Sequence, residues 1–264
     1  MSSWSNCGKR GRNMTRVSDI AAFLAEEIPP ALKEDYDNVG LLCGFPDREV
    51  SCVLVSLDVD LETIQEAESM GAQLIVAHHP VIFSPLQAVL ENDPVGRRVI
   101  RLIQKGISAV CMHTNLDRLP GGVNSALANA VGAQSAEMLD MGCTAFLTES
   151  VGMDTFLARV KAALGASGIR YHDAGRPVGH IALCGGAGGD IIYEAARLGC
   201  DTALTGEIKH HQWLDGQELG LNLIEAGHFA TENVVLPQLR DMLSKRFPEM
   251  RIAVSARGPV TREL

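Results

Sequence analysis

Apolar runs alternate with amphipathic helical segments along most of the chain. The run SCVLVSL at 51–57 predicts a buried strand, whereas 61–70 has helical spacing and ends before Gly71. The same pattern predicts further strands at 74–77, 107–112, 178–184, 202–204, 221–224 and 252–254. It predicts further helices from Ser18 to Pro29, from Asp93-Pro94 onward, and at 123–131, 155–164, 191–198 and 230–246. Strands that alternate with helices indicate βαβ units, so we expect an α/β fold with mixed, largely parallel sheets.

One segment interrupts the alternation. Residues 131–150 contain turn residues and an irregular stretch, which separate two α/β runs, and a long helical stretch over 207–219 precedes the last strands. Neither segment has the Pro, Gly and Ser content of a flexible linker. We therefore expect two α/β units whose boundaries lie near these two segments.

Histidines and carboxylates follow several of the predicted strands directly. His78-His79 come after the strand 74–77, and His113 comes after the strand that ends at Met112. Asp117 is four residues beyond His113, and Glu232 is four residues beyond His228, which follows the strand 221–224. Ligands of parallel α/β sheets collect outside the carboxyl ends of the strands. The sequence therefore predicts that these side chains share one site.

Metal binding is the chemistry that explains this set of residues best. A His–x3–Glu pair at the start of a helix places both side chains on one face, and adjacent histidines on a strand point in opposite directions, which suits two metals. The three imidazoles and two carboxylates are too few to close two sites, so a bridging carboxylate and water would complete them. Mixed nitrogen and oxygen ligands suit Zn, Fe, Mn, Co or Ni and do not choose among them. The expected ligands are His78, His79, Asp117, His228 and Glu232.

Each of these residues also has an explanation without a metal. The pair His78-His79 could be a polar strand end, and Asp117 could cap a turn before Pro120. His228 and Glu232 could be a helix start and a surface acid. The metal hypothesis gains weight because all of these residues fall at one edge of the predicted sheets.

Two glycine-containing turns lie near the same edge. The run Gly185–Asp190 (GGAGGD) separates a strand from a helix, as a phosphate-binding loop would, but it lacks the G-x-G-x-x-G spacing and the Lys-Ser/Thr of a P-loop. A tight chain reversal and an anion contact both remain open for it. Thr205-Gly206-Glu207 could lie over the same cavity, whereas His210-His211 are expected to be solvated helix residues.

The composition excludes several classes of function. The 264 residues carry 23 basic and 32 acidic side chains, a net charge of −9, which argues against a general nucleic-acid binder. The chain contains no apolar run of the roughly 20 residues that span a membrane. The seven cysteines are scattered, without a C-x-x-C pair, and indicate a reducing cytoplasm. No G-x-S-x-G motif supports a serine nucleophile.

The first residues differ from the rest of the chain. Residues 1–16 carry Lys9, Arg10, Arg12 and Arg16 and no acidic residue. A short organelle transit peptide is one interpretation. We expect instead a disordered tail over 1–14, with Met14 as an alternative translation start.

Six motifs occur in an order that resembles a known family. They are DNVGL (37–41), IVAHHPVIF (75–83), MHTNLDRLPGGVN (112–124), GGAG (185–188), TGE (205–207) and GHFATE (227–232). Together they resemble the NIF-three-like dinuclear metal-centre proteins, which are often labelled GTP cyclohydrolase I type 2 homologues. The resemblance covers residues from about 15 to the end of the chain.

This resemblance implies a two-domain α/β protein that assembles as a toroidal homo-hexamer with a dinuclear site in each subunit. The matching ligands are His78, His79, Asp117 and His228, with Glu232 as the bridging carboxylate. Residues 15–130 and 222–264 would form the metal-site domain, and 131–221 an inserted second domain. The substrate-binding candidates are Asn38, Thr205 and Glu207.

The functional hypothesis is metal-assisted hydrolysis of a small phosphorylated or nucleotide substrate, because two bound ions can activate water. In this hypothesis His113 orients the site or shuttles a proton. A second hypothesis is ring opening of GTP with release of formate. A third, from another class, is a metal-binding regulator or chaperone without catalysis.

Overall fold

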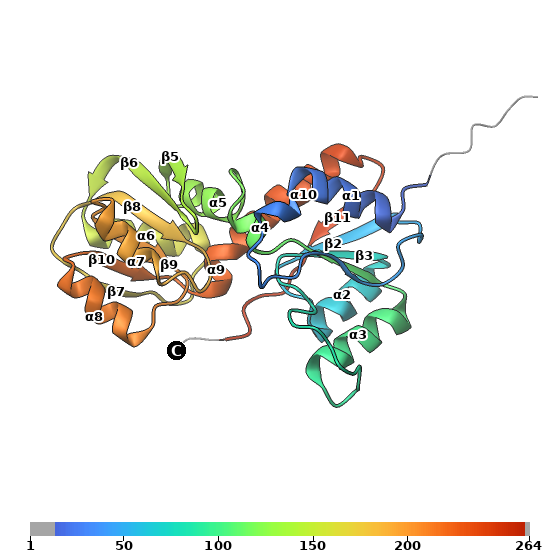
Figure 1. The fold of residues 1–264 in the computed structure, drawn as a ribbon. Coiled ribbons are helices and arrows are strands. Elements are labelled where there is room, and N and C mark those ends of the chain that lie inside the picture. The colour runs from blue at the N-terminus through green and yellow to red at the C-terminus, as the bar shows by residue number, and fades with distance from the viewer. Residues whose placement is uncertain (1–13, 262–264) are drawn as a thin grey trace, which may run out of the picture.

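Two β-sheets organise the chain into two lobes that lie side by side (Figure 1). The computed structural model describes residues 14–261. In the first lobe the strand order is β1-β4-β3-β2-β11, with β1 antiparallel to β4 and the other four strands parallel. The bounds are β1 Gly40–Cys43, β2 Cys52–Ser56, β3 Leu74–Ala77, β4 Ser108–Cys111 and β11 Arg251–Val254.

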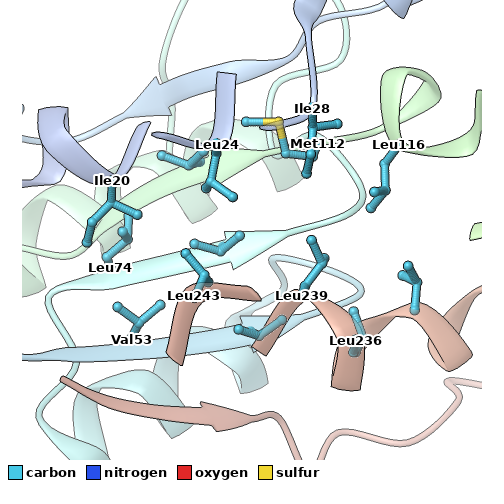
Figure 2. Packing of buried hydrophobic residues seen from close by; sticks show 14 of the residues in the cluster. Ile20, Leu24, Ile28, Val53, Leu74, Met112, Leu116, Leu236, Leu239 and Leu243 are labelled. Atoms are coloured by element: carbon cyan, nitrogen blue, oxygen red, sulfur yellow. The ribbon is translucent and has the colours of Figure 1, made fainter. Parts of the chain in front are cut away.

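Both faces of this first sheet are covered by helices. Alternate residues of a strand point to opposite faces, so in β2 Val53 packs on one side and Leu54 on the other. On the Val53 side, Figure 2 shows side chains such as Leu24 and Leu239 gathered in one apolar layer. That layer belongs to the helices α1 (Val17–Glu27) and α10 (Leu236–Arg246), and the opposite face carries α2 (Leu61–Met70) and α3 (Pro94–Lys105).

The second lobe has a six-stranded sheet of order β5-β6-β8-β9-β10-β7. Its neighbours β8, β9 and β10 are parallel, and the outer strands pair antiparallel. The bounds are β5 Ala133–Met138, β6 Cys143–Val151, β7 Arg170–His172, β8 Val178–Cys184, β9 Thr202–Thr205 and β10 Asn222–Glu225. Its helices are α5 (Val123–Ala130), α6 (Met153–Leu164), α7 (Ile191–Arg197) and α8 (His210–Glu218).

Helix α5 ties the two lobes together. Val123 and Ala126 pack in the core of the first lobe, whereas Leu127 and Ala128 pack in the core of the second. The short segments η1 (Pro30–Leu32), α4 (Thr114–Asp117), α9 (His228–Glu232) and η2 (Asn233–Val235) complete the fold. Both α4 and α9 lie where the two lobes meet (Figure 1).

The predicted α/β class with mixed, mostly parallel sheets is confirmed, but several elements differ from the prediction. Residues 131–150 are not irregular: they form β5 and the long β6. The strand predicted at 221–224, assigned by resemblance to the metal-site domain, joins the second sheet between β9 and β7. The helix predicted at 230–246 begins at His228 and passes through η2, since Pro237 lacks the N–H for a continuous helix.

The described cysteines form no cross-links in the fold. The six cysteines within the described residues are free and buried. The predicted tail, apart from Met14, lies outside the described residues. None of the helices within residues 14–261 combines the length and the hydrophobicity that a membrane-spanning helix requires.

Candidate metal centre

The candidate site lies between the two sheets, at the carboxyl ends of strands from both lobes. Asp58 follows β2, His78 and His79 follow β3, and His113 follows β4. The second lobe contributes α9, which begins at His228 directly after β10. The topology therefore gathers side chains from distant parts of the chain at one point, as the carboxyl-end rule predicts.

Glu232 is the centre of the cluster. Its Oε1 lies 3.7 Å from His78 Nε2, and its Oε2 lies 3.0 Å from His79 Nε2 and 3.1 Å from His228 Nε2. Asp117 Oδ1 lies 3.7 Å from His78 Nε2. Both carboxylates are buried, and His78 is fully buried. Every ligand expected from the sequence is therefore present in one cluster.

Three overlapping groups in this cluster could each hold a metal ion. Within each group the potential ligand atoms lie no more than 4.8 Å from one another. The groups are His78 with His79 and His113, His79 with His228 and Glu232, and His78 with Asp117 and Glu232. His113 thus lies close enough to act as a ligand itself, in addition to the orienting role expected of it.

Each imidazole of the cluster is held through its Nδ1 atom. His78 Nδ1 lies 2.9 Å from Met112 O, and His79 Nδ1 lies 2.8 Å from Asp58 Oδ1. The remaining two contacts join His113 to Asp37 at 2.8 Å and His228 to Glu207 at 2.7 Å. A protein that binds a metal through histidine commonly fixes the other ring nitrogen in this way. The arrangement directs the Nε2 lone pairs into the cluster.

Two polar atoms of the cluster are buried without a hydrogen-bond partner. They are His78 Nε2 and Glu232 Oε2, the two atoms that point toward the neighbouring ligands. Burying such an atom unpaired costs about 1–3 kcal/mol. Glu232 Oε2 lies near two imidazoles, but neither contact has the geometry of a hydrogen bond. A divalent cation would satisfy both atoms, so the residues present fit a metal ion.

The electrostatics of the cluster favour positive charge. Burial opposes protonation of His79, but Asp58 and Glu232 outweigh it and raise the pKa to about 10. The nearby Glu232 carboxylate is the main cause that raises the pKa of His228 to about 9. Burial opposes ionisation of Glu232, yet the imidazoles of His228 and His78 hold its pKa well below the usual range. The carboxylates that attract protons to these imidazoles would equally attract a metal cation.

The glycine run after β8 packs directly against the cluster. A side chain at Gly186, whose φ is +61°, would place its Cβ 2.1 Å from Glu232 Oε1. The N–H groups of Gly185 and Gly186 already donate to Asn124 Oδ1 and Thr231 Oγ1. Of the two interpretations left open by the sequence, these contacts favour the tight chain reversal over an anion-binding loop.

The substrate-binding candidates occupy different positions. Asn38 donates from Nδ2 to Ile82 O at 2.6 Å, and Thr205 is buried with its hydroxyl donating to Gly186 O at 3.3 Å. Glu207 contacts His228 and lines a cavity on one side of the cluster. His210 and His211 are exposed at the start of α8, as expected.

Sequence reasoning missed two carboxylates that position the histidines. Asp58 follows β2 at the same sheet edge as the histidine pair, so the carboxyl-end rule could have found it. Asp37 lies within the DNVGL motif, where only its contacts with His113 and Thr114 reveal its role. Hydrogen bonds from these two residues outweigh its burial and hold the pKa of Asp37 well below the usual range.

The cluster opens into a cavity of about 420 Å³. Its walls include His79, His113, Asp117, His228 and Glu232. This volume falls within the roughly 300–1,000 Å³ of small-molecule sites. The cavity would therefore admit a small substrate to the candidate ligands.

Comparison with known proteins shows which family the chain belongs to. The model for Duf34/NIF3 (NGG1p interacting factor 3) matches residues 15–258. The chain belongs to the DUF34/NIF3 family. A relative in this family from Clostridium perfringens, named "GTP cyclohydrolase 1 type 2 homolog", is 31% identical over 92% of this chain and 98% of its own length. A Lactococcus lactis relative of the same name is 33% identical over 81% of this chain and 86% of its own length.

Solved structures agree with the DUF34/NIF3 assignment. The crystal structure of Staphylococcus aureus protein SA1388 has a TM-score of 0.87 at 26% identity, covering 95% of this chain and 99% of that one. A Bacillus cereus protein related to NIF3 has a TM-score of 0.86 at 23% identity, covering 93% and 98%. The second likeness supports the fold alone.

Proposed function

We propose that this protein is a metal-dependent hydrolase that acts on a small phosphorylated or nucleotide substrate. The observation that carries the proposal is the pair of buried, unpartnered ligand atoms, His78 Nε2 and Glu232 Oε2, at the wall of an open cavity. The proposed cofactor is two divalent cations per subunit, drawn from Zn, Fe, Mn, Co and Ni. The proposed ligands are His78, His79, Asp117, His228 and Glu232.

Glu232 takes the bridging position in this proposal. It shares one group of ligand atoms with His79 and His228 and another with His78 and Asp117. Five protein ligands are too few to fill the coordination positions of two ions, so positions are left for substrate and water. Bound cations would polarise a phosphoryl oxygen and lower the pKa of water.

His113 holds a proton at its Nε2 atom in the proposed reaction. Asp37 fixes the opposite ring nitrogen at 2.8 Å, and the ring lines the cavity. A histidine oriented in this way is suited to transfer a proton to a leaving group. Without that proton, the same Nε2 atom could instead serve as a further ligand.

We also propose an assembly, which the family resemblance implies, and a location, which the scattered cysteines indicate. The protein would form a toroidal homo-hexamer in the cytoplasm. Native mass spectrometry at micromolar concentration tests the assembly: a mass of six chains supports the ring, and a stable monomer contradicts it.

The test of the reaction is a turnover assay with metal-loaded and chelator-treated protein. Nucleoside triphosphates, including GTP, and simple phosphoesters serve as substrates, with phosphate and formate measured separately. We expect phosphate release that disappears on chelation and in Glu232→Gln, whereas the exposed control Glu218→Gln keeps it. Formate from GTP without phosphate would instead indicate ring opening. Full metal occupancy without turnover would indicate a binding protein and contradict the hydrolase.

A further inference from the structure

Two aromatic side chains stand exposed beside the candidate metal centre. Tyr36 is 65% exposed and Phe83 is 46% exposed, and both line the cavity that contains His113 and Glu232. Their ring centroids lie 6.2 Å apart, with an angle of 54° between the planes. Tyr36 comes from the segment before β1, and Phe83 follows the histidine pair after β3. Distant parts of the chain thus converge on one wall of the cavity.

Exposure alone does not distinguish these rings. Phe146 and Tyr171, each 51% exposed, lie in strands β6 and β7 and line none of the cavities that border the cluster. Phe83 differs in a second way, because its ring meets the His113 imidazole edge-on at 6.0 Å and 83°. This contact places the Phe83 ring beside His113, at the edge of the metal cluster.

The tilt of the two rings determines what they can bind. Aromatic rings prefer offset-stacked or edge-to-face contacts. A flat ligand ring stacked on one of these two aromatic side chains would meet the other side chain at an angle. It would therefore make an offset-stacked contact with one ring and a tilted, more edge-to-face contact with the other. An aliphatic ligand gains only general apolar burial from the same wall.

A second cavity, of about 560 Å³, continues from this wall away from the cluster. It shares Tyr36, Met141 and Gly188 with the first cavity. Its charged side chains are mainly carboxylates, with Asp190 accepting one hydrogen bond at Oδ1 from Gln212 and Glu194 paired with Arg197. Ionised carboxylates accept hydrogen bonds and repel phosphate. The carboxylate-lined second cavity therefore suits the N–H edge of a ring rather than an anionic group.

We propose that Tyr36 and Phe83 form a stacking platform for a planar, nitrogen-containing aromatic ring of the substrate, with its N–H edge directed toward Asp190. The ring would lie against the Tyr36–Phe83 wall, where the first cavity meets the second at Tyr36, while the anionic end of the same molecule reaches the metal cluster. This inference rests on the proposed function and names the part of the substrate that gives specificity. Tyr36 and Phe83 are specificity-determining residues and take no part in the chemistry.

Equilibrium binding to the metal-loaded protein tests the platform. The probes are guanosine and adenosine monophosphate, with ribose 5-phosphate as the probe that lacks a ring. We expect the nucleotides to bind about tenfold more tightly than ribose 5-phosphate, the scale of one base stacked on an aromatic side chain. In Tyr36→Leu and Phe83→Leu, which keep apolar bulk, this preference should disappear. The exposed controls Tyr171→Leu and Phe146→Leu should retain it.

The outcomes separate this inference from the proposed function. Equal binding of all three probes by the native protein would overturn the platform, and so would a nucleotide preference that survives in both platform variants. In either case, metal-dependent hydrolysis of phosphoesters could still be measured and would stand. A platform that binds nucleotides as expected, without hydrolysis of any of them, would support this inference and contradict the hydrolase.

Discussion

The Nε2 atoms of His79 and His228 lie 3.4 Å apart, although the two residues are 149 positions apart in the sequence. Each ring is fixed at Nδ1 by a carboxylate, Asp58 for His79 and Glu207 for His228. Two nitrogen lone pairs directed at each other repel, unless a proton or a cation lies between them. The two imidazoles therefore favour a proton or a metal cation between them, at the junction of the two lobes.

Glu207→Ala should weaken metal binding without unfolding the protein. Its carboxylate is 59% exposed and contacts His228 Nδ1 at 2.7 Å, so its loss frees the imidazole to rotate. Residues that orient a metal ligand typically contribute about 10–100-fold to affinity. Isothermal titration with Zn²⁺ and Mn²⁺ measures the change, with Glu218→Ala as the exposed control. An affinity equal to that of the control would contradict the orienting role.

Gly186→Ala should lower both the free energy of unfolding and the metal content of the protein. A Cβ at this position would lie 2.1 Å from Glu232 Oε1 and 3.1 Å from His228 Nε2. Gly199→Ala is a matched control, since Gly199 also has a positive φ, +70°, but open space around its Cα. Alanine in this left-handed conformation costs about 1–2 kcal/mol at either position.

Overpacking should make Gly186→Ala about 1–3 kcal/mol less stable than Gly199→Ala in urea unfolding. Its metal content should also fall, whereas that of Gly199→Ala should match the native protein. Equal stability and equal metal content in the two variants would show that the loop after β8 does not constrain Glu232.

The Asp60–Arg257 pair predicts a dependence of stability on pH. Asp60 accepts a hydrogen bond from Thr63 N at 2.8 Å, and its Oδ2 lies 3.1 Å from the Arg257 guanidinium. Burial raises the pKa of Asp60, but the Thr63 and Arg257 contacts outweigh it and lower the pKa overall. A depressed pKa adds stability above the unfolded-state value of about 3.9, and this stability is lost as the pH falls through the folded-state pKa.

Asp60→Asn keeps a side chain that can cap α2 but removes the charge. Urea unfolding at several pH values should show a deficit of about 1 kcal/mol at pH 6–7, the scale of a partly exposed ion pair with a hydrogen bond. This deficit should shrink as the pH falls below about 4, where Asp60 becomes protonated in the unfolded chain, and should vanish once the pH is below the lowered folded-state pKa. A deficit that is constant from pH 7 to pH 3 would mean that the ion pair contributes nothing.

Leu239→Ala tests the core that supports α9 and Glu232. Leu239 is 1% exposed and packs in the apolar layer between α10 and the first sheet (Figure 2). Truncation of a buried leucine typically costs about 2–5 kcal/mol. The midpoint of urea unfolding should fall accordingly, while the exposed control Leu214→Ala should change little. A cost below about 1 kcal/mol would show that the layer is loosely packed.

Local sequence patterns predict both the central strands and the candidate ligands, because each depends on residues that are close together in the sequence. Buried parallel strands such as Leu74–Ala77 are continuous apolar runs, and the polar residues that follow them must lie at the carboxyl edge. The position of His78 and His79 directly after this strand is therefore enough to predict that they lie at the edge of the sheet.

Features that depend on contacts between distant residues were not predictable in this way. Strand β6 is exposed along much of its length and begins after Gly142, so its sequence resembles a loop. Strand β10 belongs to the second sheet because of its pairing with β9 and β7, which no local pattern encodes. Asp37 acts on His113 across 76 residues, and only the fold brings them together.

If Glu232 bridges two metal ions, as proposed, each chain binds two ions, and a count of the bound metal tests this directly. Elemental analysis would follow gel filtration of native protein incubated with a mixture of Zn²⁺, Mn²⁺, Fe²⁺, Co²⁺ and Ni²⁺. Circular dichroism would establish that the Glu232→Gln variant is folded. We expect two ions per native chain and fewer than one in Glu232→Gln. A native chain that retains no metal, or a folded variant that retains both ions, would contradict this expectation.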